Sequence, residues 1–138
     1  MTGYSGTPLA KKLGIKSGFK AKLVNSPLYY IQLFTDMPAE IYFENDERSE
    51  KDFIHFFTKQ KDEFLTKLPI LKTQIKPTGM IWVSWPKKDS KVITDVTEDV
   101  VRNYALEIGL VDIKVCAVDE IWSGLKLVIP VKDRKPSA

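Results

Sequence analysis

Cysteine, histidine and long apolar runs are scarce in this chain, and each scarcity excludes a class of protein. The 138 residues contain one cysteine and one histidine. A lone cysteine cannot form an internal disulfide, and one histidine with one cysteine cannot supply the about four ligands of a zinc site. No segment approaches the roughly 18 to 20 consecutive apolar residues of a membrane-spanning helix, and residues 1–6 contain no apolar signal core. We therefore expect a soluble, cytoplasmic protein with no metal site and no membrane attachment.

Glycine is missing where a nucleotide-binding domain needs it most. Residues 19–24 have the pattern of a first strand, but the chain then continues as Asn25-Ser26-Pro27-Leu28-Tyr29-Tyr30. A loop that holds a phosphate or a nucleoside uses glycines so that its backbone can come close to the ligand. Proline and two tyrosines instead keep the backbone away from a ligand. The sequence therefore predicts no bound cofactor, and it shows no recognisable set of catalytic residues.

The composition is that of an ordinary folded domain. Hydrophobic residues make up 43% and charged residues 28% of the chain, which excludes disorder along its whole length. We expect one domain over residues 1–138, with a flexible arm at 1–6 and a frayed, charged tail at 132–138. The net charge of +3 is small, and part of it lies in that tail, so it is weak evidence for a nucleic-acid partner.

Strands alternate with helices along the chain, which predicts a mostly parallel sheet covered on both faces. The apolar run at 53–57 is typical of a parallel strand buried on both faces. The link at 119–124 is too short for a parallel crossover and predicts a hairpin. The expected strands are 19–24, 41–43, 53–57, 80–85, 112–118 and 125–129, and the expected helices are 9–13, one after Ser26-Pro27, 59–75 and one that ends at Gly109.

Local signals define several ends of these elements. Thr7 is expected to cap the first helix, with Pro8 at its first position, and Asp95 and Thr97 compete to cap the last helix. The highly charged stretch at 44–52 predicts a solvated loop. Residues 76–79, which contain a proline and a glycine, predict a turn before the next strand.

These elements predict an α/β fold, namely a mostly parallel, Rossmann-like three-layer sheet that ends in an antiparallel C-terminal hairpin. The block from 53 to 129, which contains LKTQIKPTGMIWVSWP, resembles the middle and end of class I methyltransferases. That resemblance implies a glycine-rich loop after the first strand and a ribose-binding acid after the second. The chain lacks the loop, and Glu44 is the only candidate for the acid.

A second resemblance covers nearly the whole chain. It rests on four blocks, GYSGTPLAKKLGIKSGFK, MIWVSWPKK, TDVTEDVVRNYAL and GLVDIKVCAVDEIWSGLKLVI. These blocks are similar to a family of small bacterial proteins that is classed as a domain of unknown function. The resemblance implies no particular activity.

Candidate binding residues follow from the rule that ligands in open α/β sheets bind outside the carboxyl ends of the parallel strands. Tryptophan and lysine at this rim can hold a flat anionic ligand such as a nucleotide or a base. The alternative is structural: Trp85 and Trp122 pack on each other, while Asp119 and Glu120 neutralise the lysines. The candidate rim for a small ligand or a protein partner consists of Asn25, Ser26, Tyr29, Ser84, Trp85, Lys87, Lys88, Asp119, Glu120, Trp122 and Ser123.

The single histidine and the single cysteine have structural interpretations. His55 lies in the middle of the presumed buried strand, which favours a hydrogen-bonded core imidazole over a general base. Cys116 lies in the middle of a predicted strand, where an inert, small apolar side chain is expected.

Three functions are compatible with this sequence. The first is a non-catalytic module that binds a small ligand or a partner at the rim. The second is a divergent enzyme that still binds S-adenosylmethionine or a nucleotide. The third is weak nucleic-acid binding. One mode would be a helix-turn-helix that starts at 9–15, but the strand expected at 19–24 argues against it. The other mode would be a lysine-rich face formed by Lys11, Lys12, Lys16, Lys20 and Lys22.

Overall fold

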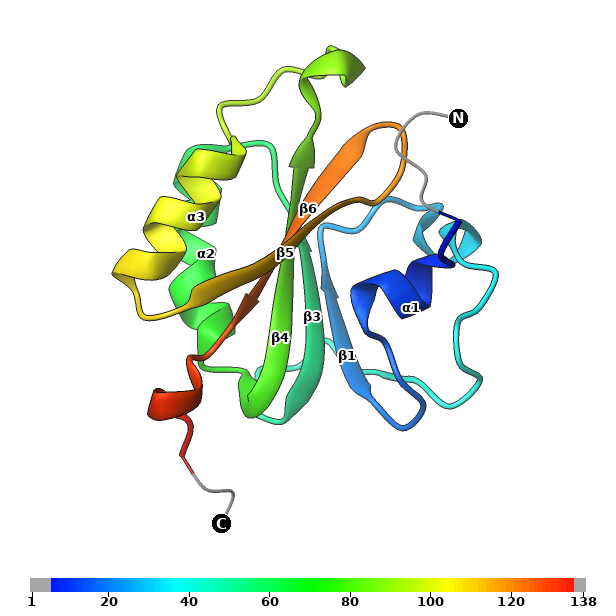
Figure 1. Ribbon diagram of the computed structural model, residues 1–138, viewed down its shortest axis with the longest axis vertical. Coiled ribbons are helices and arrows are strands. Elements are labelled where there is room, and N and C mark those ends of the chain that lie inside the picture. The colour runs from blue at the N-terminus through cyan, green and yellow to red at the C-terminus, as the bar shows by residue number, and fades with distance from the viewer. Residues whose placement is uncertain (1–5, 136–138) are drawn as a thin grey trace.

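The computed structural model describes residues 6–135 (Figure 1). Of the expected N-terminal arm only Gly6 lies in this range, and residues 136–138 of the expected tail lie outside it. Within the range, no helix is long and apolar enough to cross a membrane. The elements are α1 (Leu9–Leu13), β1 (Lys20–Val24), the 3-10 helix η1 (Tyr30–Leu33), β2 (Tyr42–Phe43), β3 (Lys51–Phe57), α2 (Lys61–Lys72), β4 (Ile75–Pro86), η2 (Lys88–Ser90), α3 (Glu98–Glu107), β5 (Val111–Ala117), β6 (Trp122–Val128) and η3 (Val131–Asp133).

Six strands form one sheet in the order β2-β1-β3-β4-β6-β5. The first four in that order run parallel. β6 runs antiparallel to both of its neighbours, because the chain returns from β5 in a hairpin and inserts β6 between β4 and β5. The predicted fold class, a mostly parallel sheet with an antiparallel C-terminal hairpin, is therefore confirmed.

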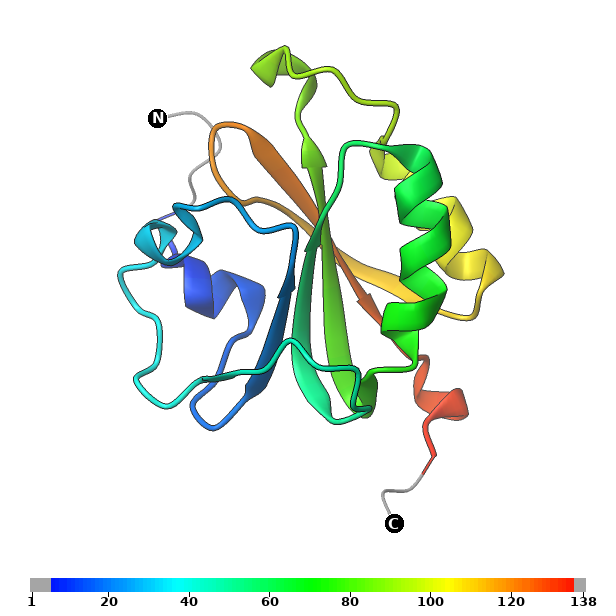
Figure 2. The same ribbon diagram turned by 180° about the vertical axis from the view of Figure 1, so that it is seen from behind.

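The sheet separates two apolar cores. α2 and α3 cover one face, and α1 and η1 cover the other (Figures 1 and 2). β3 contributes to both cores, since Ile54 and Phe56 pack toward α2 and α3, while Phe53 and Phe57 pack toward α1. Residues 53–57 are all buried, so this strand is the central one that the apolar run predicts.

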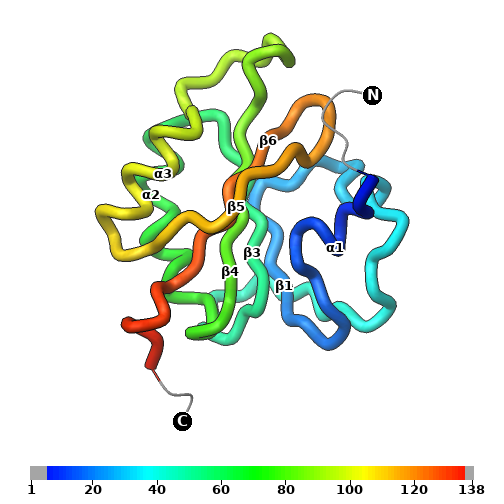
Figure 3. Tube along the Cα trace, in the orientation of Figure 1, coloured from blue at the N-terminus to red at the C-terminus, as the bar shows by residue number. Residues whose placement is uncertain are grey.

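The chain reverses its direction of travel across the sheet between β1 and β3. From β1 it moves outward to β2, then returns past β1 to form β3 and continues on the other side to β4 (Figure 3). The connection that contains η1 covers one face of the sheet, and the connection that contains α2 covers the other. A strand order of this kind leaves a crevice at the carboxyl ends of the two strands where the order reverses.

Two predicted local structures are replaced. After Ser26-Pro27 the chain forms only the short 3-10 helix η1 in place of the expected helix, and Leu28, which precedes η1, is fully exposed. Residues 76–79 form no separate turn but belong to β4, which has an irregularity in its pairing with β3. Gly79 is required in this irregular stretch, since a Cβ there would lie 2.7 Å from the carbonyl oxygen of Lys51.

The stretch at 44–52 is more than a solvated loop. Lys51 begins β3 and is completely buried, and its Nζ donates to the carboxylate of Asp46 and to the carbonyl oxygen of Arg48, 3.2 Å away. Hydrogen bonds from Lys51 and, to a smaller extent, from Arg48 lower the pKa of Asp46 to about 2. Because a buried charge is stable only when it is paired, these contacts hold the loop against the end of the sheet.

The caps of the helices are partly as predicted. Thr97 caps α3, and its side chain accepts a backbone N–H from the first turn. Asp95 instead caps α2 by accepting the N–H of Lys61 at 2.7 Å. Pro8, not Thr7, precedes α1, and Asp36 from the loop after η1 accepts two N–H groups of that helix at 2.9 and 3.0 Å. A strand follows α1, so the helix-turn-helix alternative is wrong.

Candidate functional site

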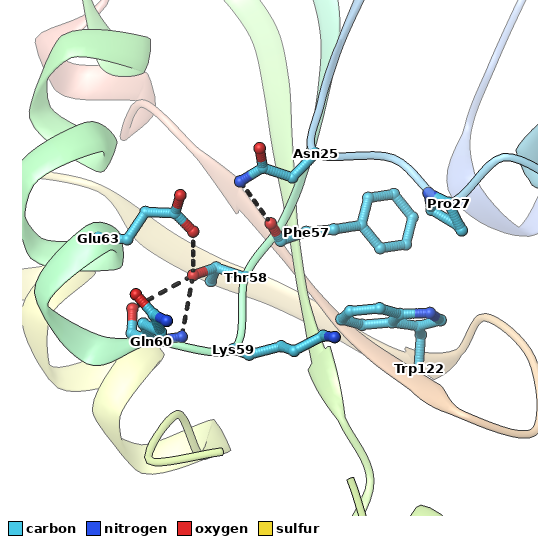
Figure 4. A pocket seen from close by; sticks show the side chains of 8 residues that line it. All are labelled: Asn25, Pro27, Phe57, Thr58, Lys59, Gln60, Glu63 and Trp122. Atoms are coloured by element: carbon cyan, nitrogen blue, oxygen red, sulfur yellow. Dashed lines mark hydrogen bonds between the residues drawn. The ribbon is translucent and has the colours of Figure 1, made fainter. Parts of the chain in front are cut away.

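A pocket of about 440 Å³ opens at the carboxyl ends of β1 and β3, the two strands between which the sheet order reverses. The end of β1, the loop that leads from β3 into α2, and the first residue of β6 contribute its walls (Figure 4). Its lining residues are Asn25, Pro27, Phe57, Thr58, Lys59, Gln60, Glu63 and Trp122.

Asn25 takes the place that a glycine-rich loop would occupy. Its backbone is left-handed, with a φ of 56°, a conformation that asparagine tolerates better than most residues other than glycine. Its side-chain Nδ2 donates to the carbonyl oxygen of Phe57 at 3.1 Å and so ties the end of β1 to the end of β3. Pro27, which has no backbone N–H, follows on the same wall.

The polar side of the pocket is formed by Thr58 and Glu63. The Thr58 hydroxyl lies 2.9 Å from Glu63 Oε1 and 3.2 Å from the carbonyl oxygen of Gln60. Burial alone would raise the pKa of Glu63, but hydrogen bonds from Thr58 and Lys67 outweigh burial, and the net pKa is lowered. The pocket therefore presents an ionised, oriented carboxylate at neutral pH.

The opposite side of the pocket is aromatic. The rings of Phe57 and Trp122 meet edge to face, with centroids 5.0 Å apart. Asp119 fixes the backbone of Trp122 by accepting its N–H at 2.7 Å, and the same carboxylate accepts the hydroxyl of Tyr29 at 3.0 Å. Burial and this hydrogen bond raise the pKa of Tyr29. In Figure 4 the Lys59 side chain extends toward Trp122, so a cation lies at this end of the pocket.

A buried polar chain supports the floor of the pocket. His55 stacks against Phe57 with ring centroids 4.2 Å apart. Its Nδ1 lies 3.0 Å from the hydroxyl of Tyr30, and its Nε2 lies 2.8 Å from the hydroxyl of Ser84. Burial lowers the pKa of His55 to about 3, so the imidazole is neutral at physiological pH. His55 is thus the hydrogen-bonded core residue that the sequence predicts, and it does not reach the pocket as a base.

The predicted rim is divided by the sheet. Trp85 belongs to the core under α2 and α3, and Trp122 belongs to the core on the α1 face, so the two tryptophans do not pack on each other. Asn25 and Trp122 line the first pocket, whereas Trp85, Lys87 and Lys88 line a second, larger pocket beside α3. The two tryptophans therefore line different pockets.

The remaining residues of the predicted rim do not lie together. Ser84 is completely buried and therefore does not lie on the rim. Tyr29 and Asp119 bond to each other beside the first pocket. Ser26, Glu120 and Ser123 line neither pocket.

Half of the residues that line the first pocket were not predicted from the sequence. The missed residues follow β3 directly, and their position after a buried parallel strand is the signal that would have found them. They are Lys59, Gln60 and Glu63, together with Phe57 at the end of β3. Glu44, the candidate ribose-binding acid, does not line this pocket.

The lysine-rich face proposed for nucleic acid is largely engaged in internal contacts. Lys20 forms an ion pair with Glu50 at 2.8 Å. Lys22 is 9% exposed, and its Nζ donates to the side-chain oxygen of Gln74 at 2.6 Å. These two lysines therefore stabilise the fold instead of offering free cations.

Comparisons with known proteins give a consistent result for the fold. No protein-family model and no curated protein sequence matches the chain, so the resemblance to a family of unknown function is not supported. Solved structures do match. A SAM-dependent methyltransferase from Aquifex aeolicus is 15% identical, with a TM-score of 0.62 and 87% of each chain covered.

Two further methyltransferases agree with this match. The 1,6-didemethyltoxoflavin-N1-methyltransferase of Burkholderia thailandensis is 11% identical, with a TM-score of 0.58, and the match covers 86% of this chain and 73% of that one. The magnesium protoporphyrin IX methyltransferase of Synechocystis is 9% identical, with a TM-score of 0.54, and the match covers 88% and 74%. Likeness at this level of identity shows the fold alone, and the fold of this chain is the methyltransferase-like α/β fold.

Proposed function

We propose that this chain is a non-catalytic module that binds a small ligand in the pocket between the ends of β1 and β3. The single observation that carries this proposal is the position of the pocket, at the point where the strand order of an open α/β sheet reverses. Ligands of such sheets bind in this crevice. The pocket is also concave, partly aromatic and equipped with a few oriented polar groups, which is typical of small-molecule sites.

The charges of the pocket favour an amino-acid-like ligand. The Glu63 carboxylate lies at one side, where its Oε1 accepts from Thr58 and its Oε2 pairs with Lys67 at 3.2 Å; its remaining acceptor positions suit an amino group. The Lys59 side chain begins beside Gln60 and extends toward Trp122, so its ammonium lies at the aromatic end of the pocket and suits a carboxylate (Figure 4). Phe57 and Trp122 offer an apolar surface for a side chain. A zwitterion with an apolar side chain matches all three features.

Calorimetric titration with L-methionine and L-phenylalanine tests this proposal, together with analogues that lack the amino or the carboxylate group. We expect the intact amino acids to bind more tightly than either analogue. Glu63→Gln should weaken binding at least about tenfold, because a charge-assisted hydrogen bond contributes roughly 1.5–3 kcal/mol. Glu47→Gln, in an exposed position outside the pocket, is the matched control. Equal affinities for the two variants would exclude this site.

The alternative function is that of a divergent enzyme that binds S-adenosylmethionine, and the fold of the solved methyltransferases favours it. The residues present do not fit that cofactor in the mode that the resemblance implies. The end of β1 continues into Asn25 and Pro27 instead of a glycine-rich loop, and Glu44 lies outside the pocket. We therefore derive no methyl-transfer step for this chain.

Thermal unfolding separates the two candidate functions. A ligand at about 100 times its dissociation constant adds roughly 2.7 kcal/mol to the free energy of unfolding, which corresponds to a rise of roughly 5–15 °C in the midpoint for a domain of this size. Our proposal predicts no such rise with S-adenosylmethionine. A rise, followed by methyl transfer to any acceptor, would replace the binding module by the enzyme.

A further inference from the structure

The second pocket has the features of an independent binding site. It has a volume of about 760 Å³ and lies between the end of β4, the loop at 87–97 and the start of α3. That loop projects beyond the carboxyl end of the sheet and forms the uppermost part of the molecule in Figures 1 and 2. Its lining residues are Trp85, Pro86, Lys87, Lys88, Lys91, Val92, Ile93, Thr94, Val96, Thr97, Glu98 and Asp99.

Hydrogen bonds hold the loop in a defined shape. The Ser90 hydroxyl donates to the carbonyl oxygen of Lys87 at 2.6 Å, and the Thr94 hydroxyl donates to the carbonyl oxygen of Lys59 at 2.7 Å. Lys91 has a left-handed backbone, with a φ of 59°, which is unfavourable for lysine and persists only where the surroundings impose it. The pocket wall is therefore largely formed before any ligand arrives.

The pocket has an excess of positive charge. Its two acidic residues, Glu98 and Asp99, both form ion pairs with Arg102. Lys87, Lys88 and Lys91 form no ion pair with any residue between 6 and 135. Three ammonium groups are thus left to meet an anion from solution.

The remaining wall is apolar. Trp85 and Val96 are buried beneath the pocket and form its floor, and Val92 lies beside them. Ile93 is 93% exposed at the rim and adds apolar surface there. A ligand that suits this pocket has a multiply charged anionic end and a flat or apolar body.

From this arrangement we propose that the second pocket binds a nucleoside diphosphate. The phosphates lie against Lys87, Lys88 and Lys91, and the base covers the wall formed by Trp85 and Val92. Phosphate groups carry the charge and the acceptor oxygens that lysine ammonium groups recognise. This site uses none of the residues of the first pocket and does not depend on the function proposed for it.

Calorimetric titration with ADP, pyrophosphate and adenosine tests the proposal. We expect ADP to bind most tightly, because only ADP engages both the lysines and the apolar wall. Changing Lys87, Lys88 and Lys91 together to alanine should weaken ADP binding at least about tenfold. The matched control changes three exposed lysines elsewhere to alanine, Lys11, Lys16 and Lys132, which removes the same net charge and should leave the affinity within about twofold.

A second variant separates binding from folding. In Lys91→Gly the left-handed backbone is no longer strained, so the thermal midpoint should be kept or raised while ADP binding weakens. The proposal is overturned if ADP does not bind, if adenosine binds as tightly as ADP, or if the control triple variant weakens ADP binding as much as the pocket triple variant does.

Discussion

Lowering the pH from 7 to 5 should destabilise this protein through one residue, His55. The sequence contains a single histidine, and in the native state its imidazole is completely buried between the hydroxyls of Tyr30 and Ser84. Burial lowers its native pKa to about 3, whereas an unfolded histidine has a pKa of about 6.5. At pH 5 the unfolded chain therefore binds nearly one proton at this position, and the native chain binds almost none.

The sign and size of the effect follow from proton linkage. Stability decreases as the pH is lowered wherever the unfolded state binds more protons than the native state. With these two pKa values, His55 contributes stability that is fully present above pH 6.5 and is lost as the pH falls toward 3. Between pH 7 and 5 the expected loss is about 2 kcal/mol. Carboxylates contribute little in this window, because their unfolded pKa values lie near 4.

Urea unfolding at a series of pH values measures this loss, and His55→Gln provides the comparison. The variant should lose the pH dependence between 7 and 5, whatever its absolute stability. The proton resonance of the single imidazole gives a second, direct readout that needs no variant. A native imidazole that titrates near pH 6.5, or a variant whose stability changes with pH as the wild type's does, would refute the reasoning.

Three further predictions concern packing and hydrogen bonds. Gly79→Ala should destabilise by about 1–3 kcal/mol, because the new Cβ meets a backbone oxygen of β3, whereas Gly6→Ala meets nothing within 4 Å; urea unfolding compares the two. Asp36→Ala removes the acceptor for two N–H groups of α1 and should cost about 0.5–2 kcal/mol, with a smaller loss for the asparagine variant. Tyr29→Phe removes the hydrogen bond to Asp119, so the free energy of unfolding should fall by about 0.5–1.5 kcal/mol. Amide hydrogen exchange in the turn at 118–122 should become faster in this variant. An unchanged exchange rate would contradict the role of that hydrogen bond.

The sheet was largely predictable because buried strands have a recognisable pattern of apolar residues in the sequence. The apolar run at 53–57 is typical of a strand covered on both sides, and the link after Val118 is too short for a parallel crossover and indicates a hairpin. The predictions that were wrong depended on distant contacts. Thr7 has the local pattern of a cap, yet Asp36 supplies the acceptors from a loop far along the chain. Residues 76–79 have the composition of a turn, yet pairing with β3 draws them into β4.

The candidate sites also combine features that local patterns predict with features that depend on distant contacts. The rule for parallel strands pointed to the carboxyl end of the sheet, and Asn25 and Trp122 line a pocket there. It could not separate Trp85 from Trp122, because neighbouring positions of paired strands face opposite sides and the register was unknown. No sequence pattern marked Glu63, which lies in the first turn of α2, as a pocket residue.

The sequence by itself determined the architecture of this protein and the absence of a glycine-rich loop after β1, because apolar periodicity and residue type act locally. Only the tertiary structure decided which side chains line the same pocket. Strand order and register bring together residues that are distant in the chain, such as Asn25, Glu63 and Trp122. The same order places the lysines of the loop at 87–97 around a separate pocket. Such groupings depend on three-dimensional distance, which no local pattern in the chain records.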